Sequence, residues 1–251
     1  MLELENISFK IYDDNREKEI LKNINIKFDN KKFIVITGPN GSGKSTLAKL
    51  IAGAITPTQG RILLDGIDIT HLSMTERAKM GIGYAFQQPV RFKGIKVYDL
   101  LKIASQSILT EKQACKYLCE VGLCANSYLE REINNSLSGG ELKRIEIATV
   151  LARQSRLAIF DEPEAGIDLW SFQKLTKVFY TMRERIDNGI IIVISHQERI
   201  LNISDEIVVV SNGTITKQGS KDAIISQILS NDSTVKICKR LKIRNKYYEN
   251  E

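Results

Sequence analysis

Gly38-Pro39-Asn40-Gly41-Ser42-Gly43-Lys44-Ser45 is the most informative segment of this 251-residue chain. It follows residues 33–37, a continuous apolar run typical of a buried parallel strand, and it precedes residues 47–54, which have the pattern of a helix. Glycines at such a junction let backbone N–H groups surround phosphate oxygens, and the helix adds the positive end of its dipole. The segment therefore predicts a phosphate-binding loop between a strand and a helix.

The residues of this loop suit a nucleoside triphosphate with Mg²⁺. Lys44 is expected to reach the β- and γ-phosphates, and Ser45 is expected to ligate the cation. A chance match to the pattern is rare, and its place directly after a strand and before a helix makes chance a poorer explanation still. The predicted nucleotide-binding residues here are Gly38, Pro39, Asn40, Gly41, Ser42, Gly43, Lys44, Ser45 and Thr46.

Apolar runs elsewhere predict an α/β core. Residues 157–160 and 190–194 are short and wholly apolar, and between them residues 171–185 have helical periodicity. Strands that alternate with helices in this way build a parallel sheet covered on both faces. Residues 2–9 and 24–28 instead alternate apolar and polar side chains, as half-buried strands do.

Residues 97–132 lack such strands and have the pattern of helices broken near Gly122 and Asn126. We expect a helical subdomain at about 95–135, inserted in a single domain that spans residues 1–230. The sequence has no internal repeat, which indicates one unit of this kind rather than two fused copies. Residues 231–251 are expected to form a basic C-terminal tail.

Charge and hydropathy limit the partners of the chain. The net charge is +6, but residues 236–251 hold six basic residues against two glutamates, so the basic character belongs to the tail. A solvated or partner-contacting tail is preferred to direct nucleic-acid binding. No apolar run approaches the ~20 residues of a membrane-spanning helix, and the N-terminus lacks the apolar stretch of a signal peptide. We expect a cytoplasmic protein without direct membrane insertion.

The four cysteines fit a reducing compartment. Cys115, Cys119 and Cys124 lie close together in sequence, but a metal site needs a full ligand set, and neither His71 nor His196 is nearby. We interpret the three cysteines as small apolar core residues, with metal binding as the alternative.

Residues 157–162, Leu-Ala-Ile-Phe-Asp161-Glu162, form an apolar run that ends in two carboxylates. The carboxyl ends of parallel strands are where α/β sheets bind ligands. Asp161 is expected to hold Mg²⁺ through its water shell, and Glu162 is expected to polarise the attacking water. Taken alone, two such acids would more often cap a helix, but the phosphate-binding loop favours the catalytic interpretation.

Residues 137–141, Leu-Ser138-Gly139-Gly140-Glu, open a further helical segment. The motifs follow the order found in the ATP-binding cassette superfamily: a phosphate-binding loop, then LSGG about 95 residues later, then Asp-Glu within about 25 more. The chain resembles that superfamily from residue 2 to about 228. The resemblance implies a P-loop parallel sheet core with an N-terminal antiparallel β subdomain and the inserted helical subdomain. It also implies an ATPase that forms a homodimer, in which the signature residues Ser138, Gly139 and Gly140 meet the γ-phosphate held by the opposite subunit.

The same resemblance assigns further positions. Gln87 matches the glutamine that touches Mg²⁺ and couples the site to the helical subdomain, and His196 matches the switch histidine near the γ-phosphate. Asp168 matches the aspartate at the dimer seam. Tyr12 is the chosen adenine-stacking aromatic, while Phe9 is the alternative or a core residue. The predicted catalytic residues are Glu162, His196 and Gln87, and the predicted metal ligands are Ser45, Gln87 and Asp161.

Several segments look most like the SufC family of iron–sulfur cluster assembly ATPases. Glu76-Arg77-Ala78, Ala85-Phe86-Gln87 and Glu198-Arg199-Ile200-Leu201 resemble its pattern. So does Glu141, where transporter cassettes more often have glutamine. The resemblance implies a SufB-like scaffold protein as the partner.

Pro163, in Pro163-Glu-Ala-Gly-Ile-Asp168, departs from that pattern and matches many transporter cassettes. The alternative is therefore the ATP-binding subunit of an ABC membrane transporter, with a permease as partner and a place peripheral to the inner membrane. A DNA-repair or chromosome-structuring ATPase would need long coiled coils, and the residues between the two halves of the site show no sustained heptads.

Overall fold

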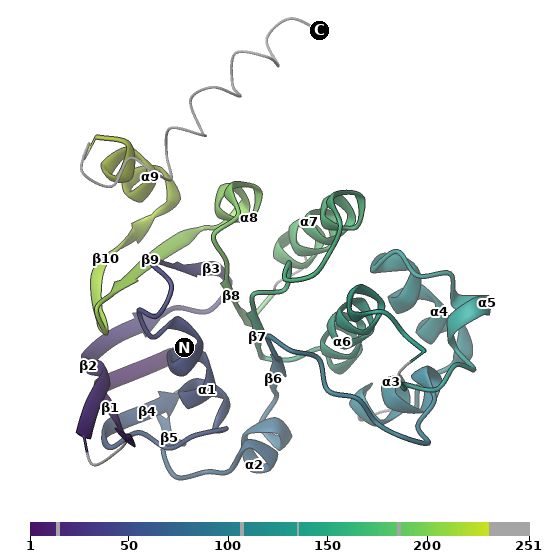
Figure 1. Ribbon diagram of the computed structural model, residues 1–251, viewed down its shortest axis with the longest axis horizontal. Coiled ribbons are helices and arrows are strands. Elements are labelled where there is room, and N and C mark those ends of the chain that lie inside the picture. Colours follow the sequence, from purple (N-terminus) through teal and green to yellow (C-terminus); the bar gives the residue numbers. More distant parts are fainter. Residues whose placement is uncertain (14–15, 106–107, 135, 185–186, 231–251) are drawn as a thin grey trace, which may run out of the picture.

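The computed structural model describes residues 1–13, 16–105, 108–134, 136–184 and 187–230 and builds them around two β-sheets (Figure 1). The predicted basic tail, residues 231–251, lies outside the described residues. The larger sheet has the strand order β10-β9-β3-β8-β7-β6, and the smaller has the order β2-β1-β4-β5. The expected combination of a parallel sheet core with an antiparallel β subdomain is confirmed.

The larger sheet is parallel except at one edge, where β10 runs antiparallel to β9. Side chains of β3, β7 and β8 are buried almost throughout, because both faces of the sheet are covered. The strands are β3 (Lys32–Thr37), β6 (Ile82–Ala85), β7 (Leu157–Asp161), β8 (Ile190–Ile194), β9 (Glu206–Ser211) and β10 (Thr214–Ser220).

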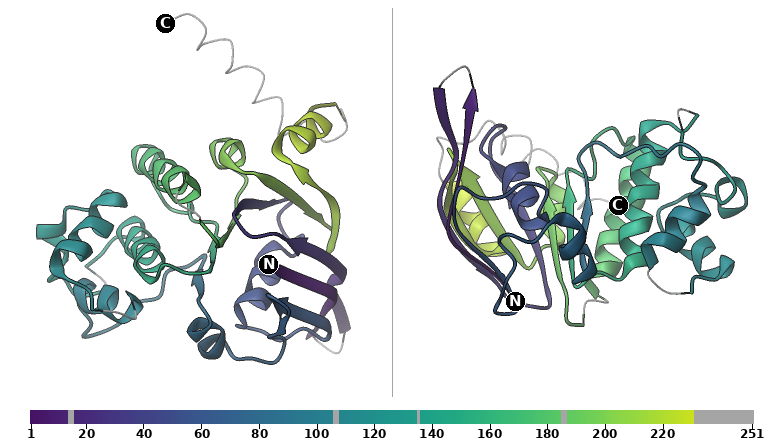
Figure 2. Two further views of the ribbon diagram at one scale, coloured as in Figure 1. Left: turned by 180° about the vertical axis from the view of Figure 1, so that it is seen from behind. Right: turned by 90° about the horizontal axis from the view of Figure 1, so that it is seen from below.

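The smaller sheet is wholly antiparallel. It consists of β1 (Leu2–Asp13), β2 (Arg16–Phe28), β4 (Gln59–Leu64) and β5 (Ile67–Asp68). β1 and β2 continue beyond the predicted residues 2–9 and 24–28 into a hairpin that extends past the rest of the molecule (Figure 2). The alternation of apolar and polar residues does not predict this extension, because its side chains are mostly exposed. They pair across the hairpin instead, as Lys10 does with Glu17.

Helices cover both faces of the larger sheet. Ile34 and Ile36 of β3 belong to the core shared with α1 and the smaller sheet, whereas Phe33 and Val35 belong to the core shared with α3 to α7. The helices are α1 (Lys44–Ala52), α2 (Met74–Lys79), α3 (Val97–Ser105), α4 (Glu111–Glu120), α5 (Ala125–Tyr128), α6 (Gly139–Arg153), α7 (Leu169–Glu184), α8 (Glu198–Ile203) and α9 (Lys221–Ser230).

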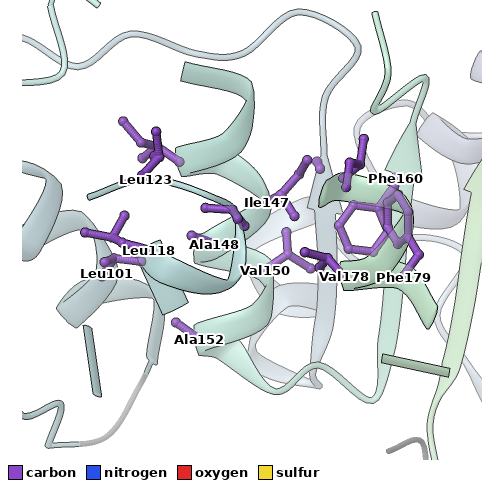
Figure 3. Packing of buried hydrophobic residues seen from close by; sticks show 14 of the residues in the cluster. Leu101, Leu118, Leu123, Ile147, Ala148, Val150, Ala152, Phe160, Val178 and Phe179 are labelled. Carbon is purple, nitrogen blue, oxygen red and sulfur yellow. The ribbon is translucent and has the colours of Figure 1, made fainter. Parts of the chain in front are cut away.

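Helix α6 lies between the helical segment α3–α5 and the larger sheet (Figure 3). Ile147 and Val150 lie toward Phe160 of β7, whereas Ala148 lies toward Leu101 of α3 and Leu118 of α4. Because α6 is covered on two sides, its buried residues extend around most of the helix and include the charged Lys143.

Two predicted boundaries are wrong. α1 begins at Lys44 rather than at residue 47, because the last residues of the phosphate-binding loop are already helical after Gly43. Asn126 lies inside the one-turn helix α5 and does not break a helix. Gly122 does mark a break. It follows the end of α4 and has a φ of 77°, a left-handed conformation that few residues other than glycine adopt.

Candidate functional site

The predicted phosphate-binding loop connects β3 to α1, and two of its positions accept only glycine. Gly38 has a φ of 139°, and a Cβ built on it would lie 1.9 Å from the carbonyl oxygen of Val210. Gly43 has a φ of 102°, and its Cβ would lie 2.7 Å from the side chain of Leu21. These conformations give the loop the curvature with which backbone N–H groups can surround a phosphate.

Lys44 is the first residue of α1, and only 5% of its surface is exposed. Its ammonium group donates hydrogen bonds of 2.9 Å to the carbonyl oxygens of Gly38 and Pro39. Desolvation lowers the pKa of Lys44, and the charges of Glu162 and Asp161 oppose that shift. One positive charge therefore lies at the centre of the loop, beside two carboxylates from the end of β7.

Asp161, the last residue of β7, is fully buried and is held by two hydroxyl groups. Ser45 Oγ donates to Oδ1 at 2.9 Å, and the Tyr84 hydroxyl donates to Oδ2 at 3.1 Å. Desolvation raises the pKa of Asp161, and both hydrogen bonds oppose the rise. Hydroxyl and carboxylate oxygens are the ligands that Mg²⁺ prefers, so Ser45 and Asp161 fit a magnesium ion at this point.

Glu162 adopts a left-handed backbone conformation, with a φ of 46°, which is uncommon for a residue with a long side chain. Its N–H donates to the carbonyl oxygen of Ile194 at 3.1 Å. Its carboxylate accepts a hydrogen bond of 2.7 Å from the side-chain amide of Gln87. Strained residues of this kind concentrate at functional sites, which agrees with the predicted role of Glu162.

His196 follows β8, and its Nδ1 lies 3.5 Å from Oγ1 of Thr37, the last residue of β3. Partial desolvation lowers the pKa of His196, the charge of Lys44 lowers it further, and Glu162 opposes the shift. The imidazole therefore shares an electrostatic environment with the loop lysine and the end of β7. The structure gathers one cluster at the carboxyl edge of the sheet: Lys44, Ser45, Gln87, Asp161, Glu162 and His196.

The predicted signature residues form the exposed start of α6. Ser138 caps the helix, since its Oγ accepts from the Glu141 N–H at 3.3 Å while its own N–H donates to Glu141 Oε2 at 2.7 Å. A Cβ built on Gly139 would meet no atom within 4 Å. Within the described residues, the hydrogen bonds of Ser138 stay inside this turn, so the signature does not join the cluster around Lys44 in its own chain.

Asp168 and Tyr12 lie outside the cluster around Lys44. A Cβ built on Gly140 would lie 3.5 Å from the carbonyl oxygen of Gly166, so the turn that carries Asp168 lies beside the signature. Tyr12 is on the β1–β2 hairpin and is 77% exposed. Phe9 is partly buried against the core that contains α1, in agreement with its interpretation as a packing residue.

Comparison with known proteins places this arrangement in a family. A family model described as ABC transporter matches residues 21–165. The chain belongs to the ABC transporter family. It is an ATP-binding cassette, which binds and hydrolyses ATP. The resemblance to the ATP-binding cassette superfamily is thereby confirmed.

The relatives of this cassette match it over most of their length. The chain is 39% identical over 217 residues to an uncharacterized ABC transporter ATP-binding protein of Methanocaldococcus jannaschii, covering 83% of this chain and 85% of that protein. It is 36% identical over 231 residues to ycf16 of Pyropia yezoensis, described as a probable ATP-dependent transporter, covering 84% and 89%. The solved ADP conformation of an ATP-binding cassette of an ABC transporter matches with a TM-score of 0.75 at 27% identity, covering 94% of this chain and 97% of that one.

Several polar residues near the site of this cassette were not predicted from the sequence. The Tyr84 hydroxyl donates a hydrogen bond to Asp161. A polar hydroxyl group within the otherwise apolar strand β6 is the sequence feature that could have indicated this role. Glu164 accepts a hydrogen bond of 2.5 Å from Ser195 Oγ, which in turn accepts from the Gln197 N–H at 3.0 Å. Burial raises the pKa of Glu164. These contacts join the turn after β7 to the segment that carries His196.

The cysteines of the cassette are less buried than predicted. Cys115 packs against the core of the helical segment, but Cys119 is exposed because Ala114 and Leu118 form the buried face of α4, and Cys124, the residue before α5, is exposed as well. In the described part of the chain, no three His, Cys, Asp or Glu side chains are grouped to hold a metal ion. None of the helices described there has the length and apolar character needed to cross a membrane.

Proposed function

We propose that this cassette hydrolyses ATP with Mg²⁺ in a homodimer, each nucleotide lying between the phosphate-binding loop of one subunit and residues 138–140 of the other. One observation carries the proposal: among the described residues, the side chain and N–H of Ser138 hydrogen-bond to Glu141 of the same turn and not to the cluster around Lys44, and a Cβ built on Gly139 would meet no atom within 4 Å. The exposed start of this 15-residue helix carries the positive end of its dipole, so it can complete an anion site that a second subunit supplies.

Each side chain of the cluster has a part in this proposal. Lys44 binds the β- and γ-phosphates, and the loop N–H groups surround them. Bound Mg²⁺, held by Ser45, Asp161 and Gln87, supplies positive charge that offsets the charge of the phosphates. Glu162 orients and polarises the attacking water, and His196 contacts the γ-phosphate. Asp168 lies at the seam between subunits, and Tyr12 stacks on adenine.

We propose further that the ATPase drives iron–sulfur cluster assembly on a SufB-like scaffold. The support is the resemblance at Arg77 and Glu141, two charged residues that hold the two helices of the site: Arg77 the end of α1 and Glu141 the start of α6. Arg77 is buried and donates to the last carbonyl groups of α1, the helix that starts at the loop. Glu141 Oε2 accepts a hydrogen bond from the N–H of Ser138, and Glu141 Oε1 accepts one from the hydroxyl of Tyr128.

A second candidate function is energising a membrane transporter. Pro163 favours it, as do the descriptions of the two relatives, one an ABC transporter ATP-binding protein and the other a probable ATP-dependent transporter. The partner in that case is a permease, and the cassette would lie at the inner membrane surface. The two candidates share the chemistry at Lys44 and Glu162 and differ only in the partner.

Anaerobic purification of the full chain from its source cell distinguishes them. The scaffold proposal predicts a complex that needs no detergent and contains iron; a permease recovered only in detergent would overturn it. The segment after Gln87 is the proposed contact, with Val90 45% and Phe92 37% exposed. The double change Arg91→Asp and Phe92→Ala should weaken the complex, whereas the matched change Lys102→Asp and Ile103→Ala on α3 should not.

A further inference from the structure

Both backbone groups of Phe86, the residue before Gln87, are held by side chains of α6. The N–H of Phe86 donates to Glu146 Oε1 at 2.8 Å, and its carbonyl oxygen accepts from Lys143 Nζ. Lys143 and Glu146 lie one turn apart on α6, and Lys143 Nζ is 3.4 Å from Glu146 Oε2. We call these two side chains the Phe86 clamp.

The clamp is a buried ion pair, with 1% of the Lys143 side chain and 13% of the Glu146 side chain exposed. Desolvation lowers the pKa of Lys143 and raises the pKa of Glu146, and each charge opposes the shift of the other. Burying such a pair is costly, and apolar residues of the same size often stabilise a fold equally well. Its presence here is therefore better explained by the geometry that it imposes on Phe86 than by a gain in stability.

That geometry concerns the hydrogen bond between Gln87 and Glu162. Lys143 Nζ lies 3.4 Å from the carbonyl oxygen of Gln87 and 3.4 Å from that of Asp161, the residue before Glu162. One ammonium group thus holds the backbone on both sides of the 2.7 Å hydrogen bond from Gln87 to Glu162. We infer that Lys143 and Glu146 are positioning residues for ATP hydrolysis: they hold the backbone at Phe86 so that the Gln87 side chain can hydrogen-bond to Glu162.

The inference rests on the roles proposed above for Gln87 and Glu162. Ser138 begins the same helix, five residues before Lys143. The clamp therefore connects the helix that meets the partner's nucleotide directly to the hydrolytic residues of its own chain. A displacement of α6 would move Phe86, and Gln87 with it.

A double-mutant cycle on the full-length chain tests this. Lys143→Met and Gln87→Ala should each lower kcat by ~10-fold while the KM for ATP changes by less than ~2-fold, because a small misplacement at the reacting centre affects the chemical step. The double variant should be no slower than Gln87→Ala alone, because both changes remove the same arrangement. Independent effects, which would multiply to a loss of ~100-fold, would overturn the inference. Full activity of Gln87→Ala would instead overturn the proposed role of Gln87, and the inference with it.

Two further variants guard against simple misfolding. Glu146→Gln keeps an acceptor for the Phe86 N–H and should retain kcat within ~2-fold, whereas Glu146→Leu removes the acceptor and should match Lys143→Met. Equal activity of Glu146→Leu and the wild type would contradict the clamp. Thr149→Val is the matched control on α6. Among the described residues, the Thr149 hydroxyl hydrogen-bonds to the Glu146 carbonyl oxygen of the same helix, at 2.6 Å, and not to Phe86 or Gln87, so kcat should not change.

Discussion

The side-chain amide of Gln87 donates a hydrogen bond of 2.7 Å to the carboxylate of Glu162. Gln87 follows β6 and Glu162 follows β7, and these strands are parallel neighbours. Because the carboxyl ends of parallel strands meet at one edge of a sheet, two residues 75 positions apart lie side by side. The hydrogen bond orients a carboxylate whose backbone is already restricted by a φ of 46°.

Lys44→Ala should abolish tight ATP binding, because Lys44 is the residue proposed to bind the β- and γ-phosphates with its positive charge. ADP binding should weaken less than ATP binding, since the contact to the γ-phosphate is absent in ADP. Titration with a fluorescent ATP analogue measures both. Wild-type affinity of the variant for the analogue would contradict the assignment of the loop.

Arg77→Met should lower the free energy of unfolding by about 3 kcal/mol or more, because buried carbonyl groups would lose a charged donor. Arg77 is 1% exposed, and burial lowers its pKa only to about 10, so the side chain stays charged at neutral pH. The carbonyl oxygens that it binds belong to Leu50, Ile51, Thr70 and Leu72. Urea unfolding should show the loss in Arg77→Met but less than about 1 kcal/mol in Arg61→Met, whose surface ion pair with Glu5 is exposed.

His196 should make the fold less stable in mild acid. Its folded-state pKa is lowered, mainly by desolvation and also by Lys44, so below about pH 6.5 the unfolded chain binds more protons at this position than the folded chain. The contribution of His196 to stability is therefore complete above that pH and is lost as the pH falls through the depressed folded-state pKa. Between about pH 7.5 and pH 5.5, urea unfolding should show a smaller loss in His196→Gln than in the wild type; equal losses would contradict the shift.

The proposed sharing of the site between two subunits predicts complementation between two inactive variants. Lys44→Ala and Ser138→Arg should each be inactive as homodimers, since every composite site contains one damaged half. An equal mixture should recover up to about a quarter of wild-type ATPase activity, because half of the dimers then hold one intact site of two. Strong activity of the Ser138→Arg homodimer would show that the signature does not complete a partner's site.

Lys44 and Asp161 illustrate what the sequence alone can predict. The loop can be recognised because phosphate binding requires glycines and a lysine at this spacing. Asp161 can be recognised because it ends an apolar strand, where α/β sheets bind ligands. Lys143 and Glu146 were not predictable, because a lysine and a glutamate on a helix usually face solvent. Only the packing of α6 between the helical segment and the sheet buries them, and that depends on contacts distant in sequence. The exposed position of Tyr12 likewise follows from the length of a hairpin that the alternation pattern does not reveal.

The behaviour of Glu162→Gln with ATP tests the central claim most directly. The isosteric amide keeps the shape of the site but cannot polarise the attacking water, so ATP should still bind while hydrolysis slows by at least ~100-fold. Unhydrolysed ATP should then hold two subunits together, and gel filtration with ATP and Mg²⁺ should show a dimer that is lost in the Glu162→Gln and Ser138→Arg double variant. ATP turnover of Glu162→Gln at the wild-type rate would contradict the role of Glu162, and a Glu162→Gln chain that stays monomeric with saturating ATP would contradict a site shared between two cassettes.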